Sequence, residues 1–264
     1  MKLTAQSIRE KKGREKIVSL TAYDFPFARI LDEAGADIVL VGDSLGMVLL
    51  GYDSTLPVTM REMIHHSKAV SRAVKQALIV GDMPFGSYQG LADRALRNGW
   101  RFIKEGGADA VKLEGGKRVV KTIEKMVRTG IAVMGHLGMT PQTATLLGGY
   151  KVQGREPKVA REILDDATRL EEAGVFSLVL ECVPWRLAGR ITKKISCPTI
   201  GIGAGPKTDG QILVLHDLLG FKGKVHPRFV RRYAEFEKEA RRAFSRYAAD
   251  VRSGTFPSLK ESFE

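Results

Sequence analysis

The sequence predicts an α/β protein that folds as a (β/α)8 TIM barrel with a short N-terminal helical segment. Short apolar runs alternate with amphipathic segments along the chain. The runs lack the polar alternation of a sheet with one wet face, which indicates parallel strands covered on both sides. Eight such runs in 264 residues give about 33 residues per unit, the spacing of a barrel of roughly 250 residues. A doubly wound open sheet would also alternate, but "TAYDFPFAR" after the first run holds no glycine-rich nucleotide fingerprint.

Each expected element follows from its own residues. The strands are the apolar runs at residues 16–23, 36–44, 77–84, 108–116, 131–138, 175–183, 197–205 and 211–220. The helices are the amphipathic segments at residues 25–35, 59–76, 91–107, 117–130, 157–174 and 184–196. Several of these helices end in "EAG", "EGG" or "RTG", the glycine C-cap signal before a following strand. The segment before residue 16 predicts a short helix that closes the bottom of the barrel, and residues 139–156 predict a Gly/Thr/Gln-rich loop.

The composition favours one globular domain over residues 1–264. Hydrophobic residues make up 44% of the chain and charged residues 27%, with no Pro/Ser-rich linker. No signal-peptide core is present, and no apolar stretch approaches the roughly 20 residues that cross a bilayer. We therefore expect a soluble, cytoplasmic protein without a membrane partner. Cys182 and Cys197 are too few for a disulfide framework, and we expect buried thiols.

The net charge of +12 would suit a nucleic-acid partner. Residues 222–252 hold ten Lys/Arg against four Asp/Glu, together with apolar residues at helical spacing. This pattern is typical of an amphipathic helix that packs on a core and keeps a solvated basic face. Because no nucleic-acid-binding motif accompanies the charge, we expect no nucleic-acid partner.

Carboxylates follow the apolar runs where catalytic residues of such barrels lie, at the carboxyl ends of the strands. Asp43 ends the second expected strand, Asp82 the third and Glu114 the fourth. Neighbouring strands would bring the first two within roughly 5 Å of each other, and ionised carboxylates that close need a proton or a cation between them. All-oxygen ligation suits Mg²⁺. The alternative is that each Asp caps the segment that follows.

Two further polar residues lie beside these carboxylates. Lys112 is two residues before Glu114, so both side chains share one face of a strand. Lys112 suits a substrate carboxylate or a developing enolate charge, although a salt bridge to Glu114 or Asp82 is the simpler role. Ser44 follows Asp43 and could donate a hydrogen bond to substrate, or serve as an ordinary helix-entry residue.

The fifth and sixth expected strands end in His136 and Glu181. His136 lies between glycines at a strand end, which suits either the site or a satisfied core histidine. Glu181 closes a strongly apolar strand, and partial desolvation there is the condition for a general base that works near neutrality. Pairing with an arginine such as Arg186 is the alternative. His65 and His66 lie on an expected helix and are interpreted as structural.

A series of motifs closely resembles the ketopantoate hydroxymethyltransferase family, also called 3-methyl-2-oxobutanoate hydroxymethyltransferases. The motifs occur in the family's order from near residue 3 to the terminal "FPSLKESF". They are "LTAYD" (20–24), "GDSLGMV" (42–48), "GDMPFGSY" (81–88), "VKLEGG" (111–116), "GHLGMTPQ" (135–142), "YKVQGR" (150–155), "LECVP" (180–184) and "IGIGAG" (200–205).

This resemblance implies a barrel of the phosphoenolpyruvate mutase and isocitrate lyase type and the first committed step of pantothenate synthesis. A one-carbon unit from 5,10-methylenetetrahydrofolate would be added to 3-methyl-2-oxobutanoate to give 2-dehydropantoate. The implied partners are these small molecules and copies of the chain itself, because the family suggests a large homo-oligomer, commonly a decamer.

The resemblance also implies roles for the site residues. The matching Mg²⁺ ligands are Asp43, Asp82 and Glu114, the last able to act through water, and the matching proton acceptor is Glu181. The matching substrate contacts are Ser44, Asp82 and Lys112, with Asp43 and His136 as further substrate-side positions. In this scheme Mg²⁺ polarises the keto group, Glu181 removes the C3 proton, and Lys112 acts electrostatically on the enolate rather than as a Schiff base.

Two other functions compete with this one. A Mg²⁺-dependent 2-oxoacid lyase or mutase of the same superfamily would use the same carboxylates, but such enzymes often carry a reactive cysteine on a mobile loop, whereas Cys182 lies in an expected strand. A basic nucleic-acid-binding protein on an inert barrel would show steeply salt-dependent binding that survives Asp43→Ala.

Overall fold

Eight parallel strands close into a barrel in the computed structural model, which describes residues 1–221 and 227–264. The strands pair in chain order and β8 returns to β1, which confirms the predicted (β/α)8 barrel. They are β1 Ile17–Thr21, β2 Ile38–Val41, β3 Leu78–Asp82, β4 Ala110–Glu114, β5 Ala132–Gly138, β6 Ser177–Glu181, β7 Thr199–Ile202 and β8 Gly210–Leu213.

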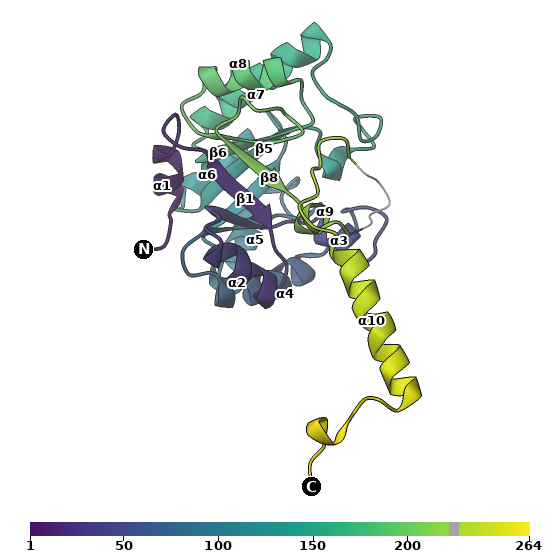
Figure 1. Ribbon diagram of the computed structural model, residues 1–264. Helices are drawn as coiled ribbons and strands as arrows, with labels where there is room; N and C mark the ends of the chain where they lie inside the picture. The colour runs from purple at the N-terminus through teal and green to yellow at the C-terminus, as the bar shows by residue number, and fades with distance from the viewer. Residues whose placement is uncertain (222–226) are drawn as a thin grey trace. The chain divides into compact units, whose positions relative to one another are not determined.

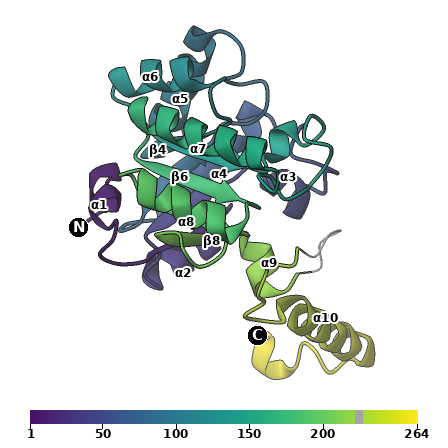
Figure 2. The same ribbon diagram turned by 90° about the horizontal axis from the view of Figure 1, so that it is seen from above.

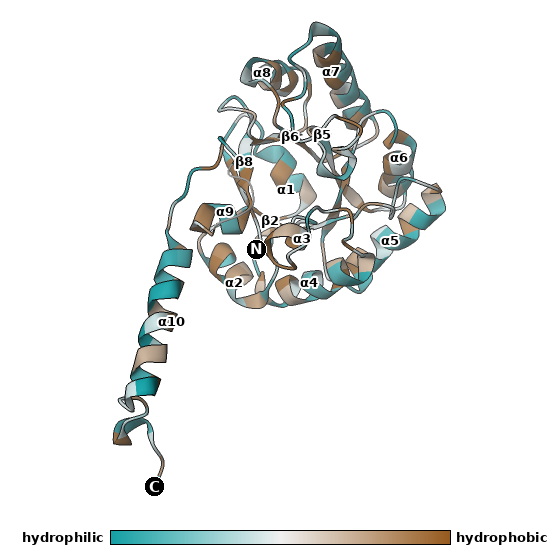
Figure 3. Ribbon diagram, turned by 90° about the vertical axis from the view of Figure 1, so that its right-hand side faces the viewer, coloured by the Kyte–Doolittle hydropathy of each residue, from teal (hydrophilic) through white to brown (hydrophobic). Residues whose placement is uncertain are grey.

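Helices surround the strands, and together they make up the unit from Met1 to Val214. Figures 1 and 2 show them on opposite sides of the strands, and Figure 3 shows them as a ring, with α1 seen inside it. They are α1 Ala5–Glu10, α2 Phe25–Glu33, α3 Leu45–Val48, α4 Met60–Ala73, α5 Ala92–Lys104, α6 Val120–Arg128, α7 Pro157–Glu172 and α8 Trp185–Lys194, with the short 3-10 helix η1 at Pro141–Thr143.

The bottom of the barrel is closed by α1, as the sequence predicts. Ile8 of α1 is fully buried and belongs to one cluster with Ile17 of β1, Ile38 of β2 and Leu78 of β3. These are residues at the amino ends of their strands. With this end filled by apolar side chains, the carboxyl ends are the face left for polar chemistry.

Only the first part of the eighth apolar run forms a strand. Residues 211–220 are expected as strand, but β8 ends at Leu213 and helix α9 covers Leu215–Leu219. A short apolar run is ambiguous between strand and buried helix, and β8 pairs only as far as Leu213 with β1. Beyond Leu213, the chain pairs with none of the described strands.

Residues Leu215–Glu264 form a second compact unit, with α9, helix α10 at Phe236–Ser253 and the 3-10 helix η2 at Leu259–Glu261. The prediction of a single domain over residues 1–264 stays a prediction. The helix expected within residues 222–252 is present as α10, while residues 222–226 lie outside the described residues. None of the side chains of α10, a helix described in full, is buried, so the predicted packing on a core is not confirmed.

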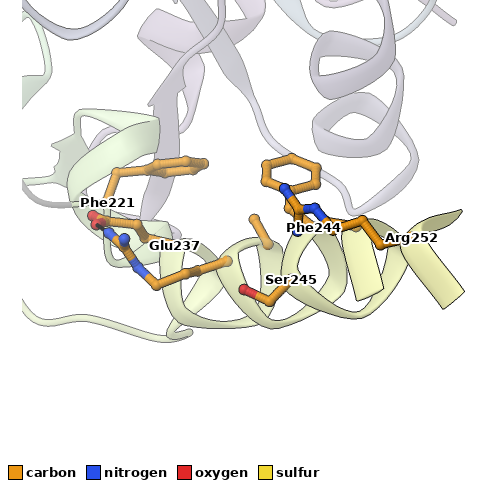
Figure 4. Close-up of a pocket in the computed structure, with 8 residues that line it drawn as sticks. Phe221, Glu237, Phe244, Ser245 and Arg252 are labelled. Carbon is orange, nitrogen blue, oxygen red and sulfur yellow. Dashed lines mark hydrogen bonds and ion pairs between the residues drawn. The ribbon is translucent and has the colours of Figure 1, made fainter. Parts of the chain in front are cut away.

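A hollow runs along α10 within this second unit. Figure 4 shows Phe221 and Phe244 on one side of the helix, with Glu237 and Ser245 near them. Glu237 pairs with Arg241 at 3.0 Å along the helix. None of the predicted site residues lines the hollow. In the described part of the chain, no helix is long and apolar enough to cross a membrane.

Candidate active site

Strand register gathers the predicted site residues at the carboxyl ends of the strands. Asp82 of β3 is the register partner of Lys112 of β4, and Glu114 of β4 is the partner of His136 of β5. Glu181 ends β6 one strand further on. Asp43 and Ser44 follow β2, and Ser44 is the N-cap residue of α3. The polar residues therefore lie on consecutive strands around the rim.

Lys112 lies at the centre of this group and is buried. Its Nζ is 2.9 Å from Asp82 Oδ1, 3.6 Å from Glu114 Oε1 and 3.3 Å from His136 Nδ1. Burial lowers the pKa of Lys112, but the charges of Asp82, Glu114 and Asp43 outweigh burial and raise it. Lys112 is therefore a cation, and the salt bridges that the sequence left as its simpler role are both present.

His136 connects this cluster to Glu181. Its Nδ1 is 3.3 Å from Glu114 Oε1, and its Nε2 is 3.2 Å from Glu181 Oε2. The second contact is electrostatic, because its geometry is not that of a hydrogen bond. Burial and the Lys112 charge lower the pKa of His136, but the two carboxylates outweigh them and raise it to about 9. At neutral pH the imidazole is therefore charged.

Asp43 is connected to the rest of the site by hydrogen bonds. Its backbone N–H donates to Asp82 Oδ2 at 3.3 Å, and its own carboxylate accepts from Gln142 Nε2 at 2.9 Å. Burial, followed by the charges of Asp82 and Glu114, raises the pKa of Asp43 well above its ordinary value. By contrast, Lys112 and His136 outweigh burial at Glu114 and lower the pKa of that carboxyl.

The structure gives the contacts of Ser44 and Glu181, for which the sequence left alternatives. Ser44 makes no side-chain cap to α3, and its hydroxyl lies 2.9 Å from the Tyr23 hydroxyl. The Glu181 side chain is 14% exposed and contacts His136, while the Arg186 guanidinium lies over the Trp185 ring. The expectation of a partly desolvated carboxylate at the end of β6 is confirmed.

Two unusual backbone conformations lie at the ends of β5 and β6. Gly138 has a φ of +98°, and a Cβ there would lie 2.1 Å from the Glu181 carbonyl oxygen, so only glycine allows this approach. Cys182 has a φ of +47°, uncommon for a residue with a side chain. Burial and the Glu181 charge raise the pKa of the Cys182 thiol to about 12, so it is not a reactive thiolate.

Sequence reasoning missed the side chains that connect the carboxylates. Gln142 reaches Asp43 with its side chain and Glu114 with its backbone N–H, and Tyr88 lies behind it. Gln142 stands in the quoted motif "GHLGMTPQ" and Tyr88 in "GDMPFGSY", but Gln142 lies in η1 and Tyr88 in the loop after β3, two segments whose path the strand pattern does not predict. His66, interpreted as structural, contacts the Tyr23 backbone carbonyl through Nδ1.

The donor set fits a hard divalent cation. In the described residues, no three His, Cys, Asp or Glu side chains already form a cluster suited to a metal ion, and Lys112 lies between Asp82 and Glu114. The carboxylates of the rim belong to Asp43, Asp82, Glu114 and Glu181. They outnumber the two basic side chains of Lys112 and His136 by two. Oxygen donors in such an excess suit Mg²⁺.

The closed barrel with titratable side chains at its strand carboxyl ends defines an enzyme of the (β/α)8-barrel class. Solved structures share this fold. A phosphoenolpyruvate phosphomutase from Streptomyces platensis subsp. rosaceus matches with a TM-score of 0.62 and 14% identity, over 96% of this chain and 88% of that one. A phosphonopyruvate hydrolase in complex with oxalate and Mg²⁺ matches with a TM-score of 0.62 and 14% identity, over 98% and 93%.

Sequence comparisons narrow the class to a family. The model of the family described as ketopantoate hydroxymethyltransferase matches residues 2–259. The 3-methyl-2-oxobutanoate hydroxymethyltransferase of Thermus thermophilus is 53% identical over the full length of both chains. That of Moorella thermoacetica is 56% identical over 96% of this chain and 94% of its own. The chain belongs to the ketopantoate hydroxymethyltransferase family and is a transferase.

Proposed function

We propose that the protein transfers a hydroxymethyl group from 5,10-methylenetetrahydrofolate to 3-methyl-2-oxobutanoate, giving 2-dehydropantoate. Family membership supports the reaction. The observation that carries the mechanism is the placing of two cations among the carboxylates of the barrel rim, with Lys112 Nζ 2.9 Å from Asp82 and His136 Nε2 3.2 Å from Glu181. Glu114 Oε1 lies near both cations, so the proposed base and the acidic cluster belong to one site.

Glu181 is the proposed base. Its carboxylate ends β6, and the charged His136 ring at 3.2 Å fixes its direction. A carboxylate held in this way can take the proton from C3 of a 2-oxoacid, whose acidity rises when the keto oxygen is polarised. His136 is then a substrate-side residue that orients the base rather than the base itself, because an imidazolium has no free lone pair.

Lys112 stabilises the negative charge that develops on the substrate oxygen. Its pKa is raised by the surrounding carboxylates, so the amine stays protonated. A protonated amine cannot attack a carbonyl, which argues against a Schiff base at this lysine. A preorganised ammonium in a buried site lowers the energy of the bound enolate at no cost in solvent reorganisation.

The acidic cluster supplies the negative charge that a bound cation would balance. Asp43, Asp82 and Glu114 are the proposed Mg²⁺ ligands, with Asp43, Ser44 and Asp82 also facing the oxoacid. When bound, Mg²⁺ supplies a Lewis acid that polarises the keto oxygen. In the transfer, the new C–C bond forms between C3 and the folate methylene carbon, the C–N bonds to folate break, and water supplies the hydroxyl oxygen.

Hydrogen–deuterium exchange at C3 of 3-methyl-2-oxobutanoate, with Mg²⁺ and without folate, tests the proposal. Wild-type protein should catalyse exchange, and Glu181→Gln should lose it by about 10²- to 10⁴-fold, the usual contribution of a general base. Binding of the oxoacid, measured by calorimetry, should persist. Glu172→Gln, at an exposed glutamate of α7, is the matched control. Undiminished exchange in Glu181→Gln would refute the base assignment.

A lyase or mutase of the same superfamily is the competing activity. Such enzymes often use a reactive cysteine, and the raised pKa of the Cys182 thiol speaks against that chemistry at this position. Turnover of phosphonopyruvate or methylisocitrate in preference to 3-methyl-2-oxobutanoate would favour the competing activity.

A further inference from the structure

We propose that Gln142, supported by Tyr88, is a positioning residue that holds Asp43 and Glu114 ready for a divalent cation. The inference rests on the proposed function, because it assumes that these carboxylates bind the metal. Gln142 is 3% exposed and Tyr88 2% exposed, so neither is a surface residue that happens to lie nearby.

Gln142 contacts both carboxylates with different groups. Its side-chain Nε2 donates to Asp43 Oδ2 at 2.9 Å, and its backbone N–H donates to Glu114 Oε2 at 3.1 Å. Asp43 follows β2 and Glu114 ends β4, so one loop residue fixes the distance between two strand ends that are not neighbours.

The orientation of the Gln142 amide is determined by its surroundings. Nε2 donates to Asp43 and to the Met83 carbonyl, both at 2.9 Å. Oε1 accepts from the Tyr88 hydroxyl at 2.7 Å and from Gln89 Nε2 at 3.0 Å. Every hydrogen-bonding position of the amide is used. A flipped amide would place its oxygen against the Asp43 carboxylate and the Met83 carbonyl, which are acceptors.

Tyr88 closes the network on its other side. Its hydroxyl donates to Gln142 and accepts from the Glu114 backbone N–H at 3.1 Å. The same tyrosine therefore anchors the end of β4 and the side chain that reaches Asp43. Removal of this hydroxyl should loosen the amide without emptying the space that the ring fills.

An amide suits this role better than a charged group. Asp43 lies among the like charges of Asp82 and Glu114, so it needs a donor that holds its direction. A lysine or arginine there would neutralise the carboxylate and compete with a cation. The neutral Gln142 amide orients Asp43 and leaves its charge for the metal, as outer hydrogen-bond partners of metal ligands commonly do.

Titration with Mn²⁺, followed by electron paramagnetic resonance, tests the inference directly. Gln142→Met should weaken Mn²⁺ binding about 10- to 100-fold, the usual effect of losing such a partner. Tyr88→Phe should weaken it several-fold, because Gln89 still holds the amide. Gln153→Met is the matched control, since Gln153 lies in the same connection between β5 and α7 and its side-chain amide donates to the Lys151 carbonyl, not to a carboxylate. The Mn²⁺ affinity of Gln153→Met should equal that of wild type.

A second readout separates positioning from general damage. In Gln142→Met, raised Mg²⁺ concentration should restore much of the lost C3 exchange, which a misfolded site would not allow. If Gln142→Met does not fold, Tyr88→Phe decides the question, and undiminished Mn²⁺ affinity there overturns the inference. If wild type and Gln142→Met bind Mn²⁺ with equal affinity, this inference is overturned and the proposed metal site stands. If wild type takes up no Mn²⁺, the proposed metal site is overturned as well.

Discussion

Gly138 and Gly130 both adopt left-handed backbone, but their surroundings differ. Gly130 has a φ of +88° and would place a Cβ in open space. Gly138 would place one 2.1 Å from the Glu181 carbonyl oxygen. The two positions therefore separate the cost of the conformation from the cost of the close approach at the site.

We expect Gly130→Ala to destabilise the protein by about 1–2 kcal/mol, the cost of left-handed backbone for an L-residue, with activity unchanged. Gly138→Ala adds a backbone clash, so it should destabilise the protein further and reduce kcat by displacing Glu181 and its contact with His136. Urea unfolding and steady-state kinetics on the two variants check this. Equal kcat in both variants would show that the approach of β5 to β6 does not position Glu181.

Among the helices, α4 begins with a capping box. The Thr59 side chain accepts from the Glu62 backbone N–H, and the Glu62 carboxylate accepts from the Thr59 N–H at 2.7 Å. Tyr52 adds a hydrogen bond to the same carboxylate at 2.6 Å. Burial raises the pKa of Glu62, but the bonds from Tyr52 and Thr59 outweigh burial and hold it below 4.5.

Glu62→Ala should lower the free energy of unfolding by about 1 kcal/mol at pH 7, the usual value of a cap. Because the folded-state pKa is depressed, this stability is fully present above the unfolded value of 4.5 and is lost as pH falls through the lower folded value. Denaturant unfolding of wild type and variant from pH 7 to pH 3 measures the difference. Glu124→Ala, in the middle of α6, is the control at pH 7 for the loss of a glutamate that is not part of a capping box.

The two ends of the barrel have different roles: the amino end contributes stability, and the carboxyl end carries the chemistry. Ile8 fills the amino end, together with the first residues of the strands, while the titratable residues lie at the carboxyl end. This division is general in such barrels. We therefore expect that a substitution which disrupts packing at one end leaves the other end intact in the molecules that remain folded.

Ile8→Ala should lower the free energy of unfolding by about 2–5 kcal/mol, since it opens a cavity in a packed cluster. Its kcat at low temperature should match that of wild type. Ile30→Ala is the matched control, because Ile30 on α2 is 50% exposed, and surface changes usually stay within about 0.5 kcal/mol. Chemical unfolding and kinetics measure both. A large fall in kcat with Ile8→Ala would mean that the ends are coupled.

The strand ends could be predicted because their pattern is local. Glu114 and Glu181 close apolar runs whose lengths match strands, and in the structure they end β4 and β6. The limits of the eighth run could not be predicted in the same way. Whether the residues after Leu213 form a strand or a helix depends on where the pairing of β8 with β1 stops. That pairing is a property of two segments, so the pattern of one segment does not predict it.

The order of apolar and polar residues was enough to predict the barrel, its closed bottom and the set of polar residues at one rim. Burial on both faces and the spacing of the strands are local properties of that order. Only the folded chain decided that Lys112 lies between Asp82 and Glu114 and that Gln142 reaches Asp43. Asp43 and Gln142 are 99 residues apart. Their contact arises from closure of the barrel and the path of one loop, which no local pattern encodes.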